Sequence, residues 1–274
     1  MALGSSPRLH AIRTPSERIA GASVTGDITF PRFDPSVVAD DGDLRHFCST
    51  CAFSQACVAE GMDKSSLGEL HMLVEHIGPL HEGDHVFREG DRFDAIAAVR
   101  AGIVKTYIID ADGREHVLGF HLPGEIIGLS AIHGDRYPCN AIALDTVMLC
   151  RFSFPKLSIL AGRLPGLQKQ LFRLMSRDIG KALQLAGDWS ADQRMAAFLI
   201  EFSRRLAARG FSATRFRLTM ARTDIANYLR LAPETVSRVL KRLQDEGLLQ
   251  IDRREVELVG LDSLEALAAP VLRD

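Results

Sequence analysis

The segment FRLTMARTDIANYLRLAPETVSRVLKRLQDEG, residues 216–247, predicts two helices joined by a short turn at 230–232. Apolar residues occur at the spacing that lets two helices cross tightly around such a turn, at Ile225, Leu229, Val236 and Leu240. Pro233 suits the first position of the second helix, and Gly247 suits its end. The segment therefore predicts a helix-turn-helix.

The sequence on either side extends this element to a domain. Before it, the apolar spacing predicts an amphipathic helix over 192–209 that ends at Gly210. After it, the apolar stretches 248–251 and 256–259 flank Arg253-Arg254, a pattern typical of two short strands joined by a turn. We expect a winged helix-turn-helix domain over residues 191–274.

The exposed face of the second helix carries side chains that can read base edges. Arg donates two hydrogen bonds to guanine, Glu accepts from the cytosine amino group, and Ser can do either. Residues near the start of such a helix reach the bases, which predicts base contacts from Glu234, Ser237 and Arg238. Phosphate contacts, which give affinity without sequence information, are expected from Arg222, Lys241 and Arg242. The alternative is a winged helix that binds another protein through an Arg-rich surface.

The charge distribution favours a polyanionic partner at one end of the chain. The net charge is only −2, but eleven Lys and Arg face three acidic residues between Arg194 and Arg242. This window carries about +8, which leaves about −10 for the rest of the chain. A basic window in an acidic chain is typical of nucleic-acid binding, although a solvated Arg-rich surface would give the same count.

Upstream, the pattern is typical of an all-β roll, barrel or sandwich. Glycines recur at turn-like positions between Gly83 and Gly134, and short apolar stretches fill the gaps at 95–99, 103–109 and 116–120. The sequence Asp110-Ala-Asp-Gly113 predicts a hairpin. With a final strand expected over 141–152, we place a β domain at 63–163.

Residues 164–190 are expected to form a long helix with two apolar faces. Leu167, Leu171 and Leu174 would pack it onto its own β domain. The other face alternates three- and four-residue steps, the a/d spacing of paired helices, through Phe172, Met175, Ile179, Ala182, Ala186 and Trp189. We predict that this seam forms a homodimer, against the alternative of an ordinary core helix. All six seam positions are apolar and the nearest acid, Asp178, lies beside the seam, which predicts that the chain can dimerise without any cofactor.

The N-terminal segment contains three closely spaced cysteines, Cys48-x₂-Cys51-x₅-Cys57. Three thiolates on one short segment can hold three corners of an iron–sulfur cluster or three sites on a zinc ion, and a fourth ligand must come from elsewhere. Two candidates exist for it, Cys139 and Cys150. We place this cysteine segment at 44–62, after a flexible extension over 1–43.

Bulk properties are those of an ordinary globular protein. Hydrophobic residues make up 46% of the chain and charged residues 25%. No apolar run reaches the roughly 18 residues of a membrane span, and the N-terminus has no signal-peptide pattern. The five cysteines are therefore expected to be reduced thiols in the cytoplasm.

Taken together, these features resemble the CRP/FNR superfamily of bacterial transcription regulators, most closely the FNR type (fumarate and nitrate reductase regulators). Besides the cysteine pattern, the resemblance is carried by the stretches 106–129, 171–179, 211–231 and 234–238. It implies an α+β fold with a cyclic-nucleotide-binding-like β-roll, a long dimerisation helix and a C-terminal winged helix-turn-helix.

The resemblance also implies a function and a cofactor. Cys150 matches the family position of the fourth ligand, which implies an oxygen-labile [4Fe–4S] cluster held by Cys48, Cys51, Cys57 and Cys150. Loss of the cluster would weaken the dimer and its binding to palindromes with TTGAT-like half-sites, and would thereby control anaerobic gene expression. RNA polymerase is an implied partner, with the hairpin at 110–115 and loops near the wing as candidate contacts.

Several alternatives remain open from the sequence. The site could bind zinc, or its cysteines could act as a cluster-free thiol switch, in a regulator that is always dimeric. A cyclic nucleotide is not expected, because Gly128 is followed by Leu129 and Arg136 by Tyr137-Pro138 where the family clamp has Gly-Glu and Arg-Ser/Thr. No Walker, Rossmann or nucleophile-elbow motif indicates an enzyme. An iron–sulfur electron carrier would not need the winged helix.

Overall fold

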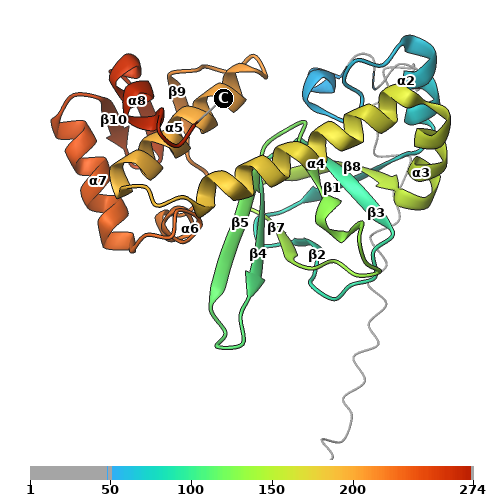
Figure 1. Cartoon of the computed structure of the whole chain (residues 1–274), viewed down its shortest axis with the longest axis horizontal. Helices are drawn as coiled ribbons and strands as arrows, with labels where there is room; N and C mark the ends of the chain where they lie inside the picture. Colours follow the sequence, from blue (N-terminus) through green and yellow to red (C-terminus); the bar gives the residue numbers. More distant parts are fainter. Residues whose placement is uncertain (1–47, 49–50, 273–274) are drawn as a thin grey trace, which may run out of the picture. The chain divides into compact units, whose positions relative to one another are not determined.

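The computed structural model describes Cys48 and residues 51–272, so the predicted extension over residues 1–43 lies outside this part of the chain. The N-terminal domain contains two antiparallel four-stranded sheets (Figure 1). One sheet has the order β1 (Val74–Leu80), β8 (Val147–Ser153), β3 (Ala95–Ala101), β6 (Ile126–Ile127). The other has the order β2 (His85–Phe87), β7 (Asn140–Ala143), β4 (Val104–Ile109), β5 (Glu115–His121). The predicted β-roll is confirmed.

The hairpin between β4 and β5 forms where the Asp-Gly turn predicted it (Figure 1). The Asp110 carboxylate accepts hydrogen bonds from the backbone N–H groups of Asp112 and Arg114, both at 2.9 Å. Gly113 adopts a φ of 79°, in the left-handed region that glycine enters without steric cost. The turn therefore depends on the local side chains that the sequence shows.

The prediction of one final strand over 141–152 is wrong. β7 ends at Ala143 and belongs to one sheet, while β8 begins at Val147 and belongs to the other. At the break, the Asp145 carboxylate accepts a 2.8 Å hydrogen bond from the backbone N–H of Ile103. A side chain at Gly102 would overlap Asp145 and Thr146. The chain thus crosses between sheets at residues 144–146, which an apolar run does not reveal.

Short helices that the apolar and glycine patterns did not predict flank the roll. They are η2 (Ser54–Ala56), α2 (Lys64–His71), η3 (Leu129–Ala131) and α3 (Phe154–Arg163). Asp63 caps α2 by accepting from the backbone N–H groups of Ser65 and Ser66 at 2.9 and 3.0 Å. No helix among the described residues has the length and apolar character to cross a membrane.

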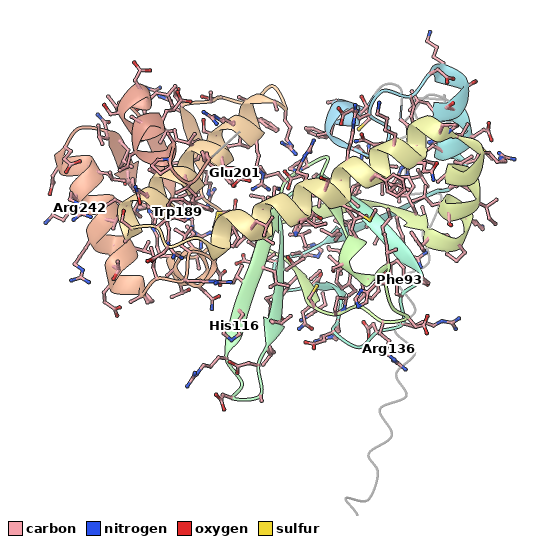
Figure 2. The ribbon with its side chains drawn as sticks, viewed as in Figure 1. Phe93, His116, Arg136, Trp189, Glu201 and Arg242 are labelled. Atoms are coloured by element: carbon pink, nitrogen blue, oxygen red, sulfur yellow. The ribbon has the colours of Figure 1, made fainter. Side chains whose placement is uncertain are left out.

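The long helix α4 follows as Pro165–Ala186 (Figure 1). The placement of Trp189 in its outer seam is wrong, because the helix ends three residues earlier and a Cβ at Gly187 would overlap the Trp189 ring. Trp189 packs against the core of the C-terminal domain instead, as Figure 2 shows. The apolar periodicity continued past the point where the helix stops.

The C-terminal domain is the predicted winged helix-turn-helix. It comprises α5 (Ala191–Ala207), β9 (Arg215–Arg217), α6 (Arg222–Tyr228), α7 (Pro233–Asp245), β10 (Leu249–Asp252), β11 (Glu255–Leu258) and α8 (Leu261–Ala268). The wing strands pair antiparallel in a sheet of order β10, β11, β9. The crossing of α6 and α7 buries the four apolar residues that the sequence singled out, Ile225, Leu229, Val236 and Leu240.

The core of this domain continues into the roll. Ile103, Val117, Phe120 and Leu122 of the roll belong to the same buried cluster as α5, α6 and α7. The Phe120 and Tyr228 rings meet edge to face with centroids 5.4 Å apart. The roll and the winged domain of one chain are thus in direct apolar contact.

Candidate functional site

Three of the four cysteines expected to bind a cofactor, Cys48, Cys57 and Cys150, have pKa values that are raised by burial and by neighbouring thiols of the set. Burial, then the nearby thiols of Cys57 and Cys51, raises the pKa of Cys48 to about 12. Burial, then chiefly Cys57 and Cys48, raises the pKa of Cys150 to about 12. Such effects require short separations. Cys57 and Cys150 also pack against the same buried cluster, so the cysteine segment and β8 lie close together.

Cys139 lies outside this group. Burial raises its pKa to about 11, and the other groups that act on it are Ser130 and Glu89. Its side chain is 4% exposed and belongs to the core between the two sheets of the roll. Of the two candidate fourth ligands, Cys150 is the one whose pKa responds to the three cysteines of the segment.

The donor set fits an iron–sulfur cluster. Burial raises the pKa of Cys57 to about 11 even though the backbone N–H groups of Ala59 and Val58 donate hydrogen bonds to its sulfur. Such hydrogen bonds to sulfur, and partial burial, are the features by which proteins tune bound clusters. Cys48 Sγ also lies 4.0 Å from His71 Nδ1.

Zinc and an iron–sulfur cluster place different demands on the spacing of their cysteine ligands. Within Cys48 and residues 51–272, no three Cys, His, Asp or Glu side chains converge closely enough to hold one metal ion. A single zinc ion needs every sulfur about 2.3 Å from one point. A four-iron cluster binds each thiolate through a different iron, so its sulfurs lie further apart. Four cysteines are a ligand set that either group uses.

The cysteine segment packs against three parts of the fold. Val58 and Ala59 are buried in one cluster with Leu167 and Leu174 of α4. A Cβ at Gly124 would lie 2.9 Å from Ala56 Cβ, so the backbone of the loop after β5 approaches the segment closely. The third part is the winged domain, where Phe211 stacks on Phe53 with centroids 6.2 Å apart. The segment is therefore placed to act on α4 and on the winged domain.

The start of α7 exposes the residues expected to read bases. Glu234, Ser237 and Arg238 are all exposed, and the apolar side of the helix is buried. Ser237 Oγ donates to the Pro233 carbonyl at 3.1 Å, and Arg238 Nη2 donates to Thr235 Oγ1 at 3.2 Å. These exposed contacts can exchange for contacts with a ligand.

The three expected phosphate contacts differ in their surroundings. Lys241 is exposed on α7. Arg242 Nε donates to Asp192 Oδ1 at 3.1 Å, which ties α7 to the start of α5. Arg222 is half-buried and donates to the Arg253 carbonyl in the wing turn at 3.2 Å. Burial lowers the pKa of Arg222. Lys241 and Arg242 are thus both exposed, while Arg222 is held against the wing turn.

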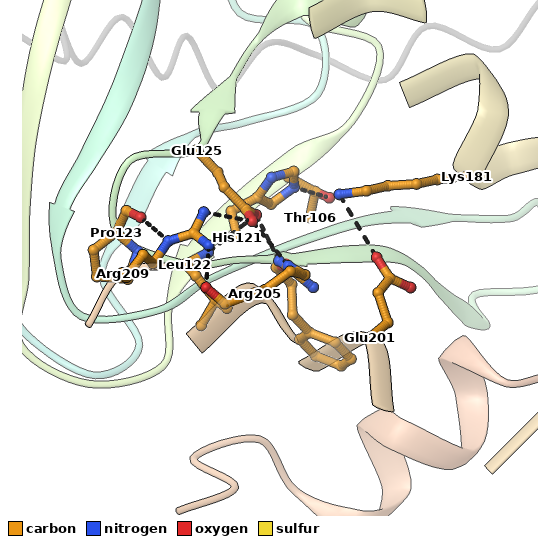
Figure 3. Close-up of polar contacts among 10 residues, drawn as sticks. Thr106, His121, Leu122, Pro123, Glu125, Lys181, Glu201, Arg205 and Arg209 are labelled. Atoms are coloured by element: carbon orange, nitrogen blue, oxygen red, sulfur yellow. Dashed lines mark hydrogen bonds and ion pairs between the residues drawn. The ribbon is translucent and has the colours of Figure 1, made fainter. Parts of the chain in front are cut away.

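Part of the basic charge between Arg194 and Arg242 is paired with acidic groups inside the fold. Arg205 of α5 and Arg209, which follows this helix, both pair with Glu125 of the roll, as Figure 3 shows. Burial alone would raise the pKa of Glu125, but Arg205, Lys181 and Arg209 outweigh it and hold this pKa well below its usual range. The charge count therefore overstates the basic surface that is open to DNA.

A second polar contact joins the helix-turn-helix to the roll. Lys105 Nζ lies 2.7 Å from Glu115 Oε1 and 3.1 Å from Asp224 Oδ1 of α6. The Asn227 side-chain amide donates to the Glu115 carbonyl and accepts from the backbone N–H of Val117. The helix α6 is thereby hydrogen-bonded along the edge strand β5.

The outer face of α4 is apolar and exposed. Phe172 is 58% exposed, Ile179 63% and Leu183 69%. Met175 is half-buried and Ala182 exposed, while the side chain of Ala186 lies outside the described residues. Leu183, four residues after Ile179, was missed because the three-residue step to Ala182 fits the same spacing. Exposed apolar faces of this size are typical of interfaces.

Arg136 and Tyr137, where the family would place a cyclic-nucleotide clamp, form contacts within the roll. Arg136 Nη1 donates to the Gly90 carbonyl at 2.5 Å. Tyr137 is 6% exposed, stacks on Phe87 with centroids 4.0 Å apart, and donates its hydroxyl hydrogen bond to the Ala95 carbonyl at 2.6 Å. Tyr137 therefore belongs to the core of the roll.

Comparisons with known proteins agree with this architecture. Residues 193–267 match the Crp-like helix-turn-helix domain family, and residues 78–161 match the cyclic nucleotide-binding domain family. Among solved structures, FixK2 from Bradyrhizobium japonicum superposes with a TM-score of 0.65 at 28% identity, covering 72% of this chain and 98% of that one.

Curated relatives extend the similarity to nearly their full lengths. The chain is 43% identical over 224 residues to the transcriptional activator protein anr of Pseudomonas aeruginosa, covering 81% of this chain and 91% of that protein. It is 39% identical over 224 residues to the fumarate and nitrate reduction regulatory protein of Escherichia coli K12, covering 81% of this chain and 90% of that protein. The first is named as a transcriptional activator and the second as a regulatory protein. The chain therefore belongs to the CRP/FNR family of transcription regulators, and within it to the FNR type.

Proposed function

We propose that this chain is an oxygen-responsive regulator of anaerobic gene expression that binds DNA as a homodimer. Its [4Fe–4S] cluster would be held by Cys48, Cys51, Cys57 and Cys150. The observation that carries the proposal is that Cys57 of the segment and Cys150 of β8 pack against one buried cluster, whereas Cys139 belongs to another. The relatives named for fumarate and nitrate reduction support the link to anaerobic genes.

The four cysteines would tie the N-terminal segment to β8. When bound, the cluster supplies an oxygen-labile link between these two parts of the chain. The segment packs on α4 through Val58 and Ala59, so its position bears on the helix whose outer face is apolar. The exposed stripe of Phe172, Ile179 and Leu183 would pair with the same stripe of a second copy.

A dimer presents two α7 helices, which matches a palindromic site. We propose half-sites like TTGAT, with base contacts from Glu234, Ser237 and Arg238. Lys241 would bind phosphate, and Arg222 and Arg242 would do so once released from the Arg253 carbonyl and Asp192. RNA polymerase would be contacted by the β4–β5 hairpin, whose tip residues Asp112 and Arg114 are 73% and 75% exposed, and by loops near the wing.

Fluorescence anisotropy with a duplex carrying a TTGAT-like palindrome tests this proposal. Anaerobically purified protein should bind it at least about 10³-fold more tightly than a scrambled duplex. Its affinity should fall with rising salt, and air should weaken it. Equal affinity for both duplexes would contradict the DNA assignment, and binding unchanged by air would contradict oxygen control.

A further inference from the structure

One polar side chain interrupts the apolar face by which α4 packs on the cysteine segment. Gln170 is 2% exposed and lies between Leu167, which is fully buried, and Leu174, which is 6% exposed. An apolar side chain would fill this position without the cost of burying an amide. A buried amide here therefore calls for a specific partner.

The partners of Gln170 belong to the cysteine segment. Its Nε2 donates to the Cys57 carbonyl at 3.1 Å and to Glu60 Oε2 at 2.9 Å. Its Oε1 is buried and accepts no hydrogen bond from any group that the structure describes. The Gln170 amide thus donates only to the cysteine segment, and its oxygen stays unsatisfied. Burying an unsatisfied acceptor costs free energy, and the two donated hydrogen bonds offset this cost only while the segment stays in place.

The other side of the same helix carries the exposed stripe. Gln170 and Phe172 are two residues apart, which places them about 200° apart around an α-helix. A packed helix moves as a rigid element, so a shift imposed at Gln170 also displaces Phe172 and Ile179. A change in the contacts of Gln170 on the inner face of α4 can therefore move the apolar side chains on its outer face.

We propose that Gln170 is the positioning residue that couples the state of the cysteine segment to dimer formation by α4. This coupling rests on the proposed function, because its effect is on the homodimer proposed there. While the segment is held, the Cys57 carbonyl and Glu60 carboxylate fix the helix through one amide. When the segment moves away, that amide loses both acceptors inside an apolar surface, and α4 must shift or rotate to rehydrate it.

Two variants separate this coupling from simple packing. Gln170→Met keeps the length of the side chain and removes both hydrogen bonds. Gln170→Glu keeps its shape but replaces the donor with a carboxylate that faces another carboxylate, Glu60. The matched control is Arg173→Gln, because Arg173 is exposed on the same helix. Circular dichroism verifies that each variant is folded, and iron and acid-labile sulfide are counted for each.

The readout is the dimer dissociation constant by sedimentation, measured with the cluster and after its removal. We expect these constants to differ by about 5- to 150-fold in the wild type and the Arg173→Gln control. In both Gln170 variants the ratio should fall to within about twofold, with iron content unchanged. A wild-type ratio in the folded variants would overturn the proposal. So would a loss of iron, since Gln170 would then hold the cluster rather than transmit its state.

Failure of the cluster assignment is distinguishable from failure of this coupling. If the wild type binds no iron, the cysteines of the metal-free protein are alkylated with iodoacetamide to displace the segment. Alkylation should then shift the dimer dissociation constant of the wild type and of Arg173→Gln but not of Gln170→Met. An equal shift in all three, or no shift in the wild type, would overturn the role of Gln170.

Discussion

Glu125 and Arg205 form a two-point ion pair between the roll and the winged domain, with Arg205 Nε 2.8 Å from Glu125 Oε1 and Nη2 2.5 Å from Oε2 (Figure 3). The two side chains are only 12% and 17% exposed. Arg209 adds a contact with Glu125 Oε1 at 2.9 Å and another with the Pro123 carbonyl. Glu125 directly follows Gly124, whose backbone closely approaches Ala56 of the cysteine segment.

Removing the Glu125 carboxylate should strongly destabilise the contact between the two domains. Glu125→Ala leaves Arg205 and Arg209 without their shared counter-ion, and breaking such a buried pair costs about 3–5 kcal/mol. Guanidinium denaturation measures the loss. The control is Glu265→Ala, which breaks the exposed ion pair between Arg204 of α5 and Glu265 of α8 and should cost at most about 1 kcal/mol. Similar losses in both variants would contradict the importance of Glu125.

The same carboxylate predicts an acid-sensitive contribution to stability. The Glu125 pKa is below its usual 4.5 in the folded chain, because Arg205, Lys181 and Arg209 outweigh burial. Its contribution is therefore fully present above pH 4.5 and is lost as the pH falls towards the lowered pKa. The unfolding free energy of wild type should decrease more steeply than that of Glu125→Gln between about pH 5 and about pH 3. Parallel pH curves would contradict the pairing.

Two substitutions on α7 should affect DNA binding differently. Arg238→Ala should cost about 1–3 kcal/mol on the palindrome and relax discrimination at one base pair. Lys241→Ala should weaken binding to all sequences alike and lower the salt slope by about one. Anisotropy titrations over a range of salt on palindromic and scrambled duplexes distinguish the two. If Arg238→Ala reduced both affinities equally, its assignment as a base reader would be wrong.

The exposed stripe on α4 should determine the dimer. Ile179→Ser or Leu183→Ser should raise the dimer dissociation constant at least about tenfold without unfolding the chain, because each removes more than about 1.4 kcal/mol of apolar burial per interface. Val259→Ser, at another exposed apolar residue, should change nothing.

With no charge within the stripe, the metal-free chain should still dimerise as its concentration rises. Sedimentation over a concentration series measures the dimer dissociation constants of the stripe variants and of the metal-free chain. A metal-free protein that stays monomeric at every concentration would contradict dimerisation without a cofactor.

Local patterns predicted much of this fold. The helix-turn-helix, its wing and the Asp-Gly hairpin were predicted because each depends on neighbouring residues: Pro233 and Gly247 bound one helix, and Asp110 and Gly113 form one turn. Periodicity misplaced Trp189, because an apolar residue at helical spacing gives the same pattern whether or not the helix continues past Gly187.

Pairings between distant residues could not be predicted. Glu125 with Arg205, and Gln170 with Cys57, join segments 80 and 113 residues apart, and no local spacing reports such contacts. The charge count between Arg194 and Arg242 misled for the same reason, since it could not show that Arg205 and Arg209 are paired inside the fold. For the cysteines, the sequence reduced the fourth ligand to two candidates, and tertiary structure brings Cys150, not Cys139, to the segment.

The measurement that tests the central claim most directly is iron and acid-labile sulfide per chain in anaerobically purified protein, with wild type, Cys150→Ser and Cys139→Ser compared side by side. We predict about four of each per chain in wild type and Cys139→Ser. We also predict an absorbance that bleaches in air, and loss of the cluster in Cys150→Ser. Stoichiometric zinc, no metal, or a cluster that needs Cys139 and not Cys150 would contradict the account.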